Sequence, residues 1–284
     1  MIARRLALAL AVLPVASVAA AGAPQAAAVA DAGFRWTGAT SQGGLIVGTA
    51  PAGTVSLTLD ARPIALAADG GFVVGFDRDA GATATLVATL TDGSTVSRVL
   101  AIAPRAWRIE RLDTLPRVPL PDPVFARLRP PELAAIAAAR ATATDARGWR
   151  QRFAWPATGR VSGLFGAQRV YRGEPGAYHA GTDIAKPAGA IVTAPADGVV
   201  ILAADHPYTL EGNLLMIDHG MGLNSAFLHL SRTDVRVGDH VRQGQPIGLV
   251  GATGRATGPH LHWALRWHDA RLDPMLAAGA MPAG

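Results

Sequence analysis

The chain has 284 residues, of which 50% are hydrophobic and 17% charged, so it can form two modest domains and is too apolar for long-range disorder. The 26 Lys and Arg residues against 21 Asp and Glu give a net charge of +5, which suits acidic partners such as cell-wall polymers. No basic run is interleaved with aromatic residues, so nucleic acid is not an expected partner, and the absence of cysteine excludes disulfides and thiolate metal sites.

The first 30 residues have the composition of an export signal. Arg4 and Arg5 form a short positive region, an apolar stretch follows over residues 6–18, and small residues then offer Ala-x-Ala-like cleavage sites. The apolar stretch is shorter than the roughly 20 residues that a stable membrane span needs, and no other segment is suited to span. We expect residues 1–30 to be a cleaved signal peptide and the mature protein to be periplasmic or secreted. Retention as an uncleaved anchor is the alternative.

Residues 31–105 predict a small, immunoglobulin-like β-sandwich domain. Short alternating hydrophobic runs, about seven of them, are separated by turn signals such as Asp69-Gly70 and Asp92-Gly93. This segment has no cluster of His and carboxylate residues. Binding or positioning is therefore its expected role, with a simple spacer as the alternative.

Residues 106–150 predict a Pro-rich connector and a helix. Residues 107–112 are a candidate for one further strand, and prolines recur from there to Pro130. Pro131-Glu132 is typical of a helix start, because proline fits the first turn and Glu lies at the positive end of the helix dipole. We expect the helix to run from Pro131 to about Ala143. The stiff connector also suggests that the N-terminal module lies over the C-terminal domain as a lid.

Residues 151–280 return to strands dense in Gly and β-branched residues, and they hold all eight histidines. The first of these, His179, is followed four positions later by Asp183. An even spacing on an extended strand places both side chains on one face, and Gly181 between them lets the backbone approach closely.

Two further histidine motifs lie downstream. His260-Leu261-His262 has an even spacing that sends both imidazoles to one side of a strand, and His229 lies within an apolar run. Each motif alone is weak, since a lone histidine in an apolar run is typical of a core residue. Together within a single Gly-rich stretch they indicate a metal site. Two His nitrogens and one Asp oxygen are the ligands of a catalytic zinc whose fourth position stays open for water.

The same segment resembles the lysostaphin-like zinc endopeptidases of peptidoglycan, of the LytM type. The resemblance covers about residues 153–275 and rests on His179-x-x-x-Asp183, Phe227-Leu228-His229-Leu230 and Gly258-Pro259-His260-Leu261-His262, with supporting stretches at residues 195–200, 213–220, 237–248 and 251–258. It implies an antiparallel β-sandwich of the duplicated hybrid motif type over residues 151–280. The whole chain is then mainly β.

The resemblance also implies roles for single residues. His179, Asp183 and His262 would be the ligands of Zn²⁺, His260 the general base, and His229 a second catalytic imidazole that stabilises the developing oxyanion. Peptidoglycan would be the substrate.

The sequence departs from the family pattern at two positions beside these motifs. Phe227 stands where Tyr is common, and Ala264 stands where an acidic residue often follows. Neither is a ligand position.

Two other functions remain open at this point. One is a non-catalytic envelope protein of the same fold that regulates other cell-wall hydrolases, and the complete ligand set counts against it. The other is a carrier domain with a biotinyl-like or lipoyl-like hairpin, which lacks a modifiable lysine because Lys186 lies just after the Asp183 motif. His219, outside the three motifs, is interpreted as a turn residue that supports a hairpin.

Overall fold

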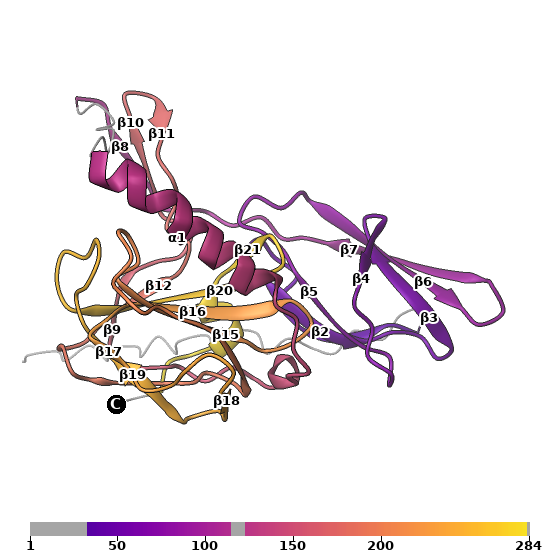
Figure 1. Cartoon of the computed structure of the whole chain (residues 1–284). Helices are drawn as coiled ribbons and strands as arrows, with labels where there is room; N and C mark the ends of the chain where they lie inside the picture. The colour runs from indigo at the N-terminus through magenta and orange to yellow at the C-terminus, as the bar shows by residue number, and fades with distance from the viewer. Residues whose placement is uncertain (1–32, 115–122, 283–284) are drawn as a thin grey trace, which may run out of the picture.

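The computed structural model describes residues 33–114 and 123–282. Its elements are mostly strands in antiparallel sheets, as the sequence predicts (Figure 1). The expected signal peptide, residues 1–30, lies outside the described residues. Among the helices of the two described ranges, none is both long and apolar enough to cross a membrane.

The N-terminal part has seven strands between Arg35 and Ala101, the number that the turn signals indicate. They form two sheets. One has the order β1-β2-β5 (Arg35–Gly38, Leu45–Thr49, Gly71–Gly75), and the other has the order β4-β3-β6-β7 (Arg62–Ile64, Thr54–Leu59, Thr83–Leu90, Thr95–Ala101). We call this part the N-terminal sandwich.

The C-terminal part is built on one large antiparallel sheet. Its path is β18-β14-β15-β16-β20-β12-β9 (His240–Val241, Gly198–Ala203, Asn213–Asp218, Leu223–Leu230, His260–Trp267, Thr182–Ala185, Arg160–Gly163), and β21 (Ala270–Leu272) pairs with β20. A smaller sheet has the order β13-β19-β17 (Ile191–Thr193, Pro246–Leu249, Arg232–Thr233). The short helices η1 (Gly148–Arg150) and α2 (Pro274–Ala278) flank these sheets.

Strand β20 shows why this sheet has one buried and one accessible face. Its residues alternate between buried and half-buried, so that Leu261, Trp263, Leu265 and Trp267 enter the core. The other face therefore carries His260 and His262. The sequence spacing predicts this arrangement.

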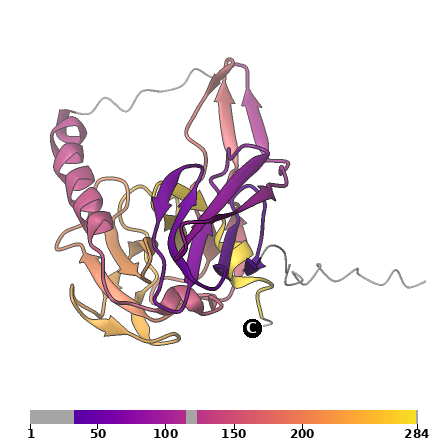
Figure 2. The same cartoon turned by 90° about the vertical axis from the view of Figure 1, so that its right-hand side faces the viewer.

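A third group of strands projects from the body of the molecule, as two views show (Figures 1 and 2). Here β8 (Ile109–Leu112) pairs in parallel with β10 (Gln168–Tyr171), which also pairs with β11 (Glu174–Pro175). The strand expected at residues 107–112 is thus present. It joins a hairpin of the C-terminal part.

Helix α1 (Pro123–Ala141) begins earlier than the sequence predicts. The expected start at Pro131 is wrong, because Pro130 and Pro131 both lie inside the helix. Each proline removes one backbone donor, which normally ends a helix. Here the turns before the prolines are held from outside the helix, since Arg129 forms an ion pair with Glu211 as well as one with Glu132 of the helix itself.

The two main parts of the chain share one hydrophobic core. A single cluster of buried residues includes Phe72 and Val74 of the N-terminal sandwich together with Trp263 and Leu272 of the C-terminal part. At Gly75 an added Cβ would lie 2.8 Å from Leu272 Cδ2, so the backbone of β5 packs directly on the C-terminal part. A second cluster lies under α1.

Candidate metal centre

Three strands and one loop bring together all five side chains that the sequence singles out. Asp183 of β12 is the register partner of His262 on β20, and Leu228 of β16 is the partner of His262 on the other side. His229 follows Leu228 directly, and His179 lies in the loop before β12. Four of the five residues thus come from neighbouring positions of one sheet, and His179 comes from the loop that leads into it.

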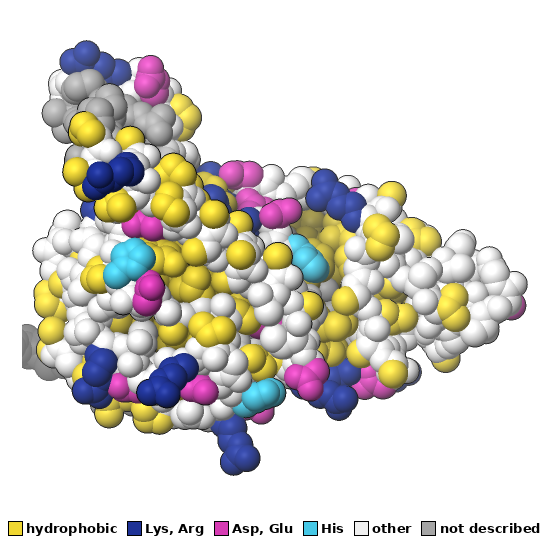
Figure 3. Space-filling model, in the orientation of Figure 1, with side chains coloured by type: hydrophobic (Ala, Val, Ile, Leu, Met, Phe, Trp, Pro, Cys, Tyr) yellow, Lys and Arg dark blue, Asp and Glu magenta, His cyan; other side chains and the backbone are white. Residues whose placement is uncertain are grey.

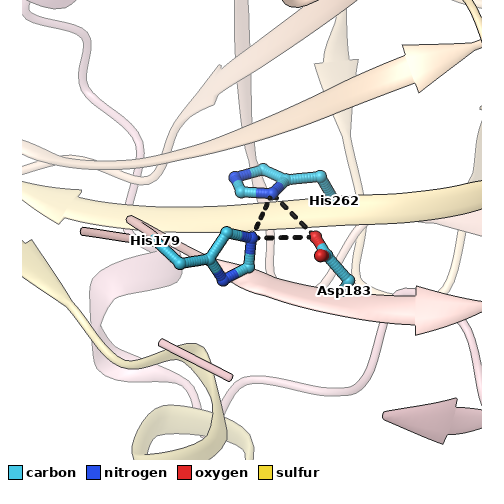
Figure 4. A group of neighbouring side chains, drawn as sticks. All are labelled: His179, Asp183 and His262. Atoms are coloured by element: carbon cyan, nitrogen blue, oxygen red, sulfur yellow. Dashed lines mark hydrogen bonds and ion pairs between the residues drawn. The ribbon is translucent and has the colours of Figure 1, made fainter. Parts of the chain in front are cut away.

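The side chains of His179, Asp183 and His262 point toward one another (Figure 4). His262 Nδ1 lies 2.8 Å from Asp183 Oδ1, and His179 Nε2 lies 3.1 Å from both of these atoms. Within the described residues, the ligand atoms of these three side chains lie close enough together to hold a metal ion.

His179 is oriented by backbone groups of the preceding segment. Its Nδ1 lies 3.0 Å from the carbonyl oxygen of Leu164. A carbonyl oxygen only accepts, so Nδ1 carries a proton and donates. In the neutral imidazole this leaves a lone pair on Nε2, aimed at Asp183 and His262, as is usual for a metal-ligating histidine.

Two glycines make room for the other two side chains of the group. A Cβ at Gly163 would overlap Asp183 Oδ2, and a Cβ at Gly181 would lie 2.6 Å from His262 Nε2. The expected close approach at Gly181 is therefore present. The requirement at Gly163 carries no signal in the sequence, since it arises from the pairing of β9 with β12.

The charges of the group favour a bound cation. Burial alone would raise the pKa of Asp183, but hydrogen bonds from the protonated forms of His179 and His262 hold it well below its usual range, so the carboxylate is ionised. Burial lowers the pKa of His262, against the opposing effect of Asp183. For His179, burial is outweighed by the hydrogen bond and charge of Asp183, and its pKa is raised. A proton and a cation thus compete for His179 Nε2.

His260 and His229 form a second pair beside the first group. His260 Nδ1 donates to the carbonyl oxygen of Gly258 at 2.8 Å, and His229 Nδ1 donates to that of Thr253, also at 2.8 Å. Their ring centroids are 4.8 Å apart, and His260 Nε2 is 3.8 Å from Asp183 Oδ1. The Nε2 atoms of both rings therefore have no proton in the neutral form and are free to accept one.

His229 adopts an unusual backbone conformation. Its φ is +64°, in the left-handed region that side chains other than glycine rarely adopt. The backbone N–H of His229 donates to the carbonyl oxygen of Glu211 at 2.8 Å, which holds this conformation. The side chain is buried, and burial lowers its pKa. Such local strain is typical of functional sites.

Sequence reasoning missed the groups that aim these imidazoles. They are the carbonyl oxygens of Leu164, Thr253 and Gly258. A backbone carbonyl is present at every position, so nothing in the residue types distinguishes these three.

This site lies in a segment that matches a known family. Residues 177–274 match the profile of Peptidase family M23. This part of the chain is therefore an M23 peptidase domain, and the resemblance to the lysostaphin-like peptidases is confirmed.

Relatives and a solved structure agree with this assignment. Peptidoglycan DD-endopeptidase ShyA of Vibrio cholerae is 43% identical over 116 residues, which are 40% of this chain and 26% of the relative. ShyB of the same organism is 46% identical over 99 residues, which are 35% of this chain and 23% of the relative. The chain thus spans about a quarter of the length of these relatives.

The fold of most of the chain recurs in a solved structure. A protein from Pseudomonas aeruginosa assigned to peptidase M23 has a crystal structure that matches with a TM-score of 0.65 at 28% identity. The match covers 86% of this chain and 96% of that one, so it extends well beyond the M23 domain.

Proposed function

We propose that this protein is a zinc-dependent endopeptidase that hydrolyses peptide cross-links of bacterial peptidoglycan. The observation that carries the proposal is the convergence of two imidazole nitrogens and one carboxylate oxygen within 3.1 Å of one another. They lie beside two further imidazoles, His229 and His260. The matched relatives named DD-endopeptidases support the same class of bond for this chain.

The donor set fits zinc. His179 Nε2, Asp183 Oδ1 and His262 Nδ1 are the ligand types of a catalytic zinc site with three protein ligands. When bound, zinc supplies Lewis-acid chemistry, which acidifies water and polarises a carbonyl oxygen. The ionised Asp183 contributes the negative charge that retains the cation.

The remaining imidazoles have the proton positions that peptide hydrolysis needs. His260 Nε2 is free to accept the proton of the attacking water and to pass it to the leaving amine, because Nδ1–H is committed to Gly258. His229 would stabilise the developing oxyanion from Nε2. This role requires a second proton on the ring, since its Nδ1–H is committed to Thr253.

The setting of the reaction is also part of the proposal. The export signal expected over residues 1–30 supports a periplasmic or secreted protein that meets the cell wall there. Lys/Arg and Asp/Glu side chains are interspersed on the face that Figure 3 shows.

The three candidate zinc ligands and the two further imidazoles are all present, which counts against a purely regulatory, non-catalytic role.

Digestion of purified peptidoglycan by the purified chain tests the proposal. We expect about one zinc per chain, shortened cross-linked peptides among the products, and loss of activity on chelation with recovery when zinc is returned. An increase in reducing sugar ends would mean that the glycan is cut and the peptidase assignment is wrong. Activity that persists in the Asp183→Ala variant would mean that the reaction occurs elsewhere.

A further inference from the structure

The loop that carries His179 is held from its other side by the N-terminal sandwich. Arg78, just after β5, has only 6% of its surface exposed. Its Nε donates to the carbonyl oxygen of Gly166 at 3.1 Å, and its Nη2 donates to Gln168 Oε1 at 3.0 Å. Both contacts cross from the N-terminal sandwich to the segment that precedes His179.

Aromatic rings enclose the same guanidinium group. It lies 4.7 Å from the ring centroid of Tyr178 and 5.4 Å from that of Trp107. Cation–π contacts of this kind gain strength when the cation is desolvated. Tyr178 is the residue directly before His179, and its hydroxyl donates to Asp77 Oδ1 at 3.3 Å. Asp77 and Arg78 therefore both contact the loop at the point where the metal-binding sequence begins.

His179 depends on this segment for its orientation. Its backbone N–H donates to Ala167 O at 2.8 Å, its carbonyl accepts from Gly166 N–H at 2.8 Å, and its Nδ1–H donates to Leu164 O at 3.0 Å. All three bonds go to residues 164–167. Arg78 fixes the carbonyl of Gly166 within this stretch and the side chain of Gln168 just after it.

We propose that Arg78 is a positioning residue for His179 and that the N-terminal sandwich is thereby part of the metal centre. The inference rests on the proposed function, since it takes His179 as a zinc ligand. Without Arg78, the buried carbonyl oxygen of Gly166 and the half-buried Gln168 Oε1 lose their donor, and residues 164–168 relax. The Nε2 atom of His179 then no longer faces Asp183 and His262. Loss of a group that hydrogen-bonds a ligand directly typically weakens metal binding by about 10-fold to 100-fold. Arg78 acts through residues 164–168, so we expect the lower end of this range.

The geometry calls for arginine at this position. The planar guanidinium donates to two acceptors at fixed angles and stacks between two rings, whereas the lysine ammonium is a single point charge. Arg78→Lys keeps the charge, but its ammonium group cannot reproduce the fixed angles of the planar guanidinium or its stacking on the rings. We therefore expect it to bind zinc with an affinity between those of the wild type and Arg78→Ala.

The experiment uses the whole chain and compares Arg78→Ala and Arg78→Lys with the control Arg62→Ala. Arg62 is an exposed arginine on β4 of the same sandwich. Three quantities are measured: the Kd for zinc by competition with a chelating dye, the absorption spectrum of the Co²⁺-loaded chain, and thermal unfolding of the metal-free chain. We expect Arg78→Ala to raise the zinc Kd about 10-fold or more and to change the Co²⁺ spectrum, with Arg62→Ala unchanged in both.

The outcomes separate this inference from the proposed function. A folded Arg78→Ala chain with wild-type zinc affinity and Co²⁺ spectrum overturns the inference, even if its unfolding temperature falls, because the role of Arg78 is then only structural. A wild-type chain that binds no zinc overturns the proposed function and the inference with it. If Arg78→Ala shows no folding transition, Gln168→Ala removes one acceptor of the guanidinium and decides the question in the same assays.

Discussion

His260 and His262 lie two residues apart on the same face of β20, yet their ring nitrogens have different partners. His262 Nδ1 faces Asp183 and His179 at 2.8 and 3.1 Å, whereas His260 Nδ1 donates to a backbone carbonyl. Removal of a metal ligand weakens metal binding, whereas removal of a general base lowers the rate and leaves the metal in place. The two residues can therefore be separated experimentally.

We expect His262→Ala to lose both zinc and activity, because two remaining ligands do not hold the ion. His260→Ala should keep zinc and lose a factor of about 10² to 10⁴ in rate, as is typical for a general base. His229→Ala should behave like His260→Ala. Metal analysis by mass spectrometry beside a peptidoglycan turbidity assay measures both effects. Zinc lost from His260→Ala but kept in His262→Ala would reverse the assignment, and full zinc in both would place the site elsewhere.

His219 illustrates a structural histidine in the same domain. It is fully buried in the turn between β15 and β16, where Nδ1 donates to Asp197 O and Nε2 accepts from Ser225 Oγ, both at 2.8 Å. The predicted support of a hairpin is therefore confirmed. Burial lowers the pKa of His219 to about 4, although the hydrogen bond to Asp197 opposes the shift.

This pKa predicts an acid-sensitive fold. Between pH 6.5 and about 4 the unfolded chain binds a proton at His219 and the folded chain does not, so the free energy of unfolding falls as the pH falls. The slope from this group is about 1.4 kcal/mol per pH unit, and its contribution to stability is complete above pH 6.5. Urea unfolding of the metal-free chain at pH 7 and pH 5 measures it. His219→Gln should lose less stability between these pH values, while the exposed control His240→Gln should match the wild type.

At the scale of elements, α1 covers part of the sheet face that carries the site. Ile136 and Ala139 of the helix pack on Met216 and Ala226, and half-buried Ala264 belongs to the same cluster. Ala264 lies two residues after His262, on the same face of β20. The helix also has exposed hydrophobic side chains, namely Val124, Leu128 and Leu133. Figure 3 shows hydrophobic side chains gathered on this part of the surface.

The ion pairs of Arg129 fasten this helix to the domain. Its guanidinium binds Glu211 through two bonds of 2.6 and 2.7 Å and Glu132 at 3.0 Å, with all three side chains at most 15% exposed. Arg129→Ala leaves the buried carboxylate of Glu132 and the half-buried carboxylate of Glu211 without a cation. We expect the free energy of unfolding to fall by about 2 kcal/mol, between the values for exposed and buried pairs. Zinc content should not change, because Glu211 contacts His229 through its backbone.

Denaturant unfolding of Arg129→Ala against the neighbouring control Arg127→Ala measures this effect. Arg127 is exposed on the same helix, so Arg127→Ala shows how much stability is lost when an arginine of this helix is replaced by alanine. Equal stability losses in the two variants would show that the ion pairs contribute nothing of their own.

At the scale of the whole molecule, the shared core argues that the N-terminal sandwich is a fixed part of the protein. Phe72 and Val74 belong to the same buried cluster as Trp263 and Leu272, and Arg105 Nη2 pairs with Asp273 Oδ2 at 2.8 Å across the junction. The lid hypothesis from the connector expects residues 150–284 alone to be more active than the whole chain. The shared core and the Arg78 contacts lead us to expect the opposite.

We therefore predict that residues 150–284 alone bind zinc more weakly and unfold more easily than the chain from residue 31 onward. Removal of the sandwich uncovers Trp267 and Leu272, which pack on Gly75 of β5, and frees the segment before His179. Zinc content, unfolding temperature and peptidoglycan digestion of the two proteins are compared side by side. Higher activity of the short protein at equal zinc content would support the lid instead.

The strands of the sheet and the five candidate side chains can be predicted from local sequence patterns. The direction of a side chain along a strand depends only on nearby residues. Every second side chain lies on the same face, so His260 and His262 share one face of β20. Turn signals such as Asp69-Gly70 are local in the same sense.

The start of α1 and the groups that support the site depend instead on contacts between distant segments. Arg78 is 88 residues from Gly166, and Arg129 is 82 residues from Glu211, so no local pattern links either pair. Gly163 looks like any strand glycine until β9 lies beside Asp183. The physical reason is the same in each case: residue type and spacing determine the direction of a side chain along its own strand, whereas the partners it meets depend on how distant segments pack.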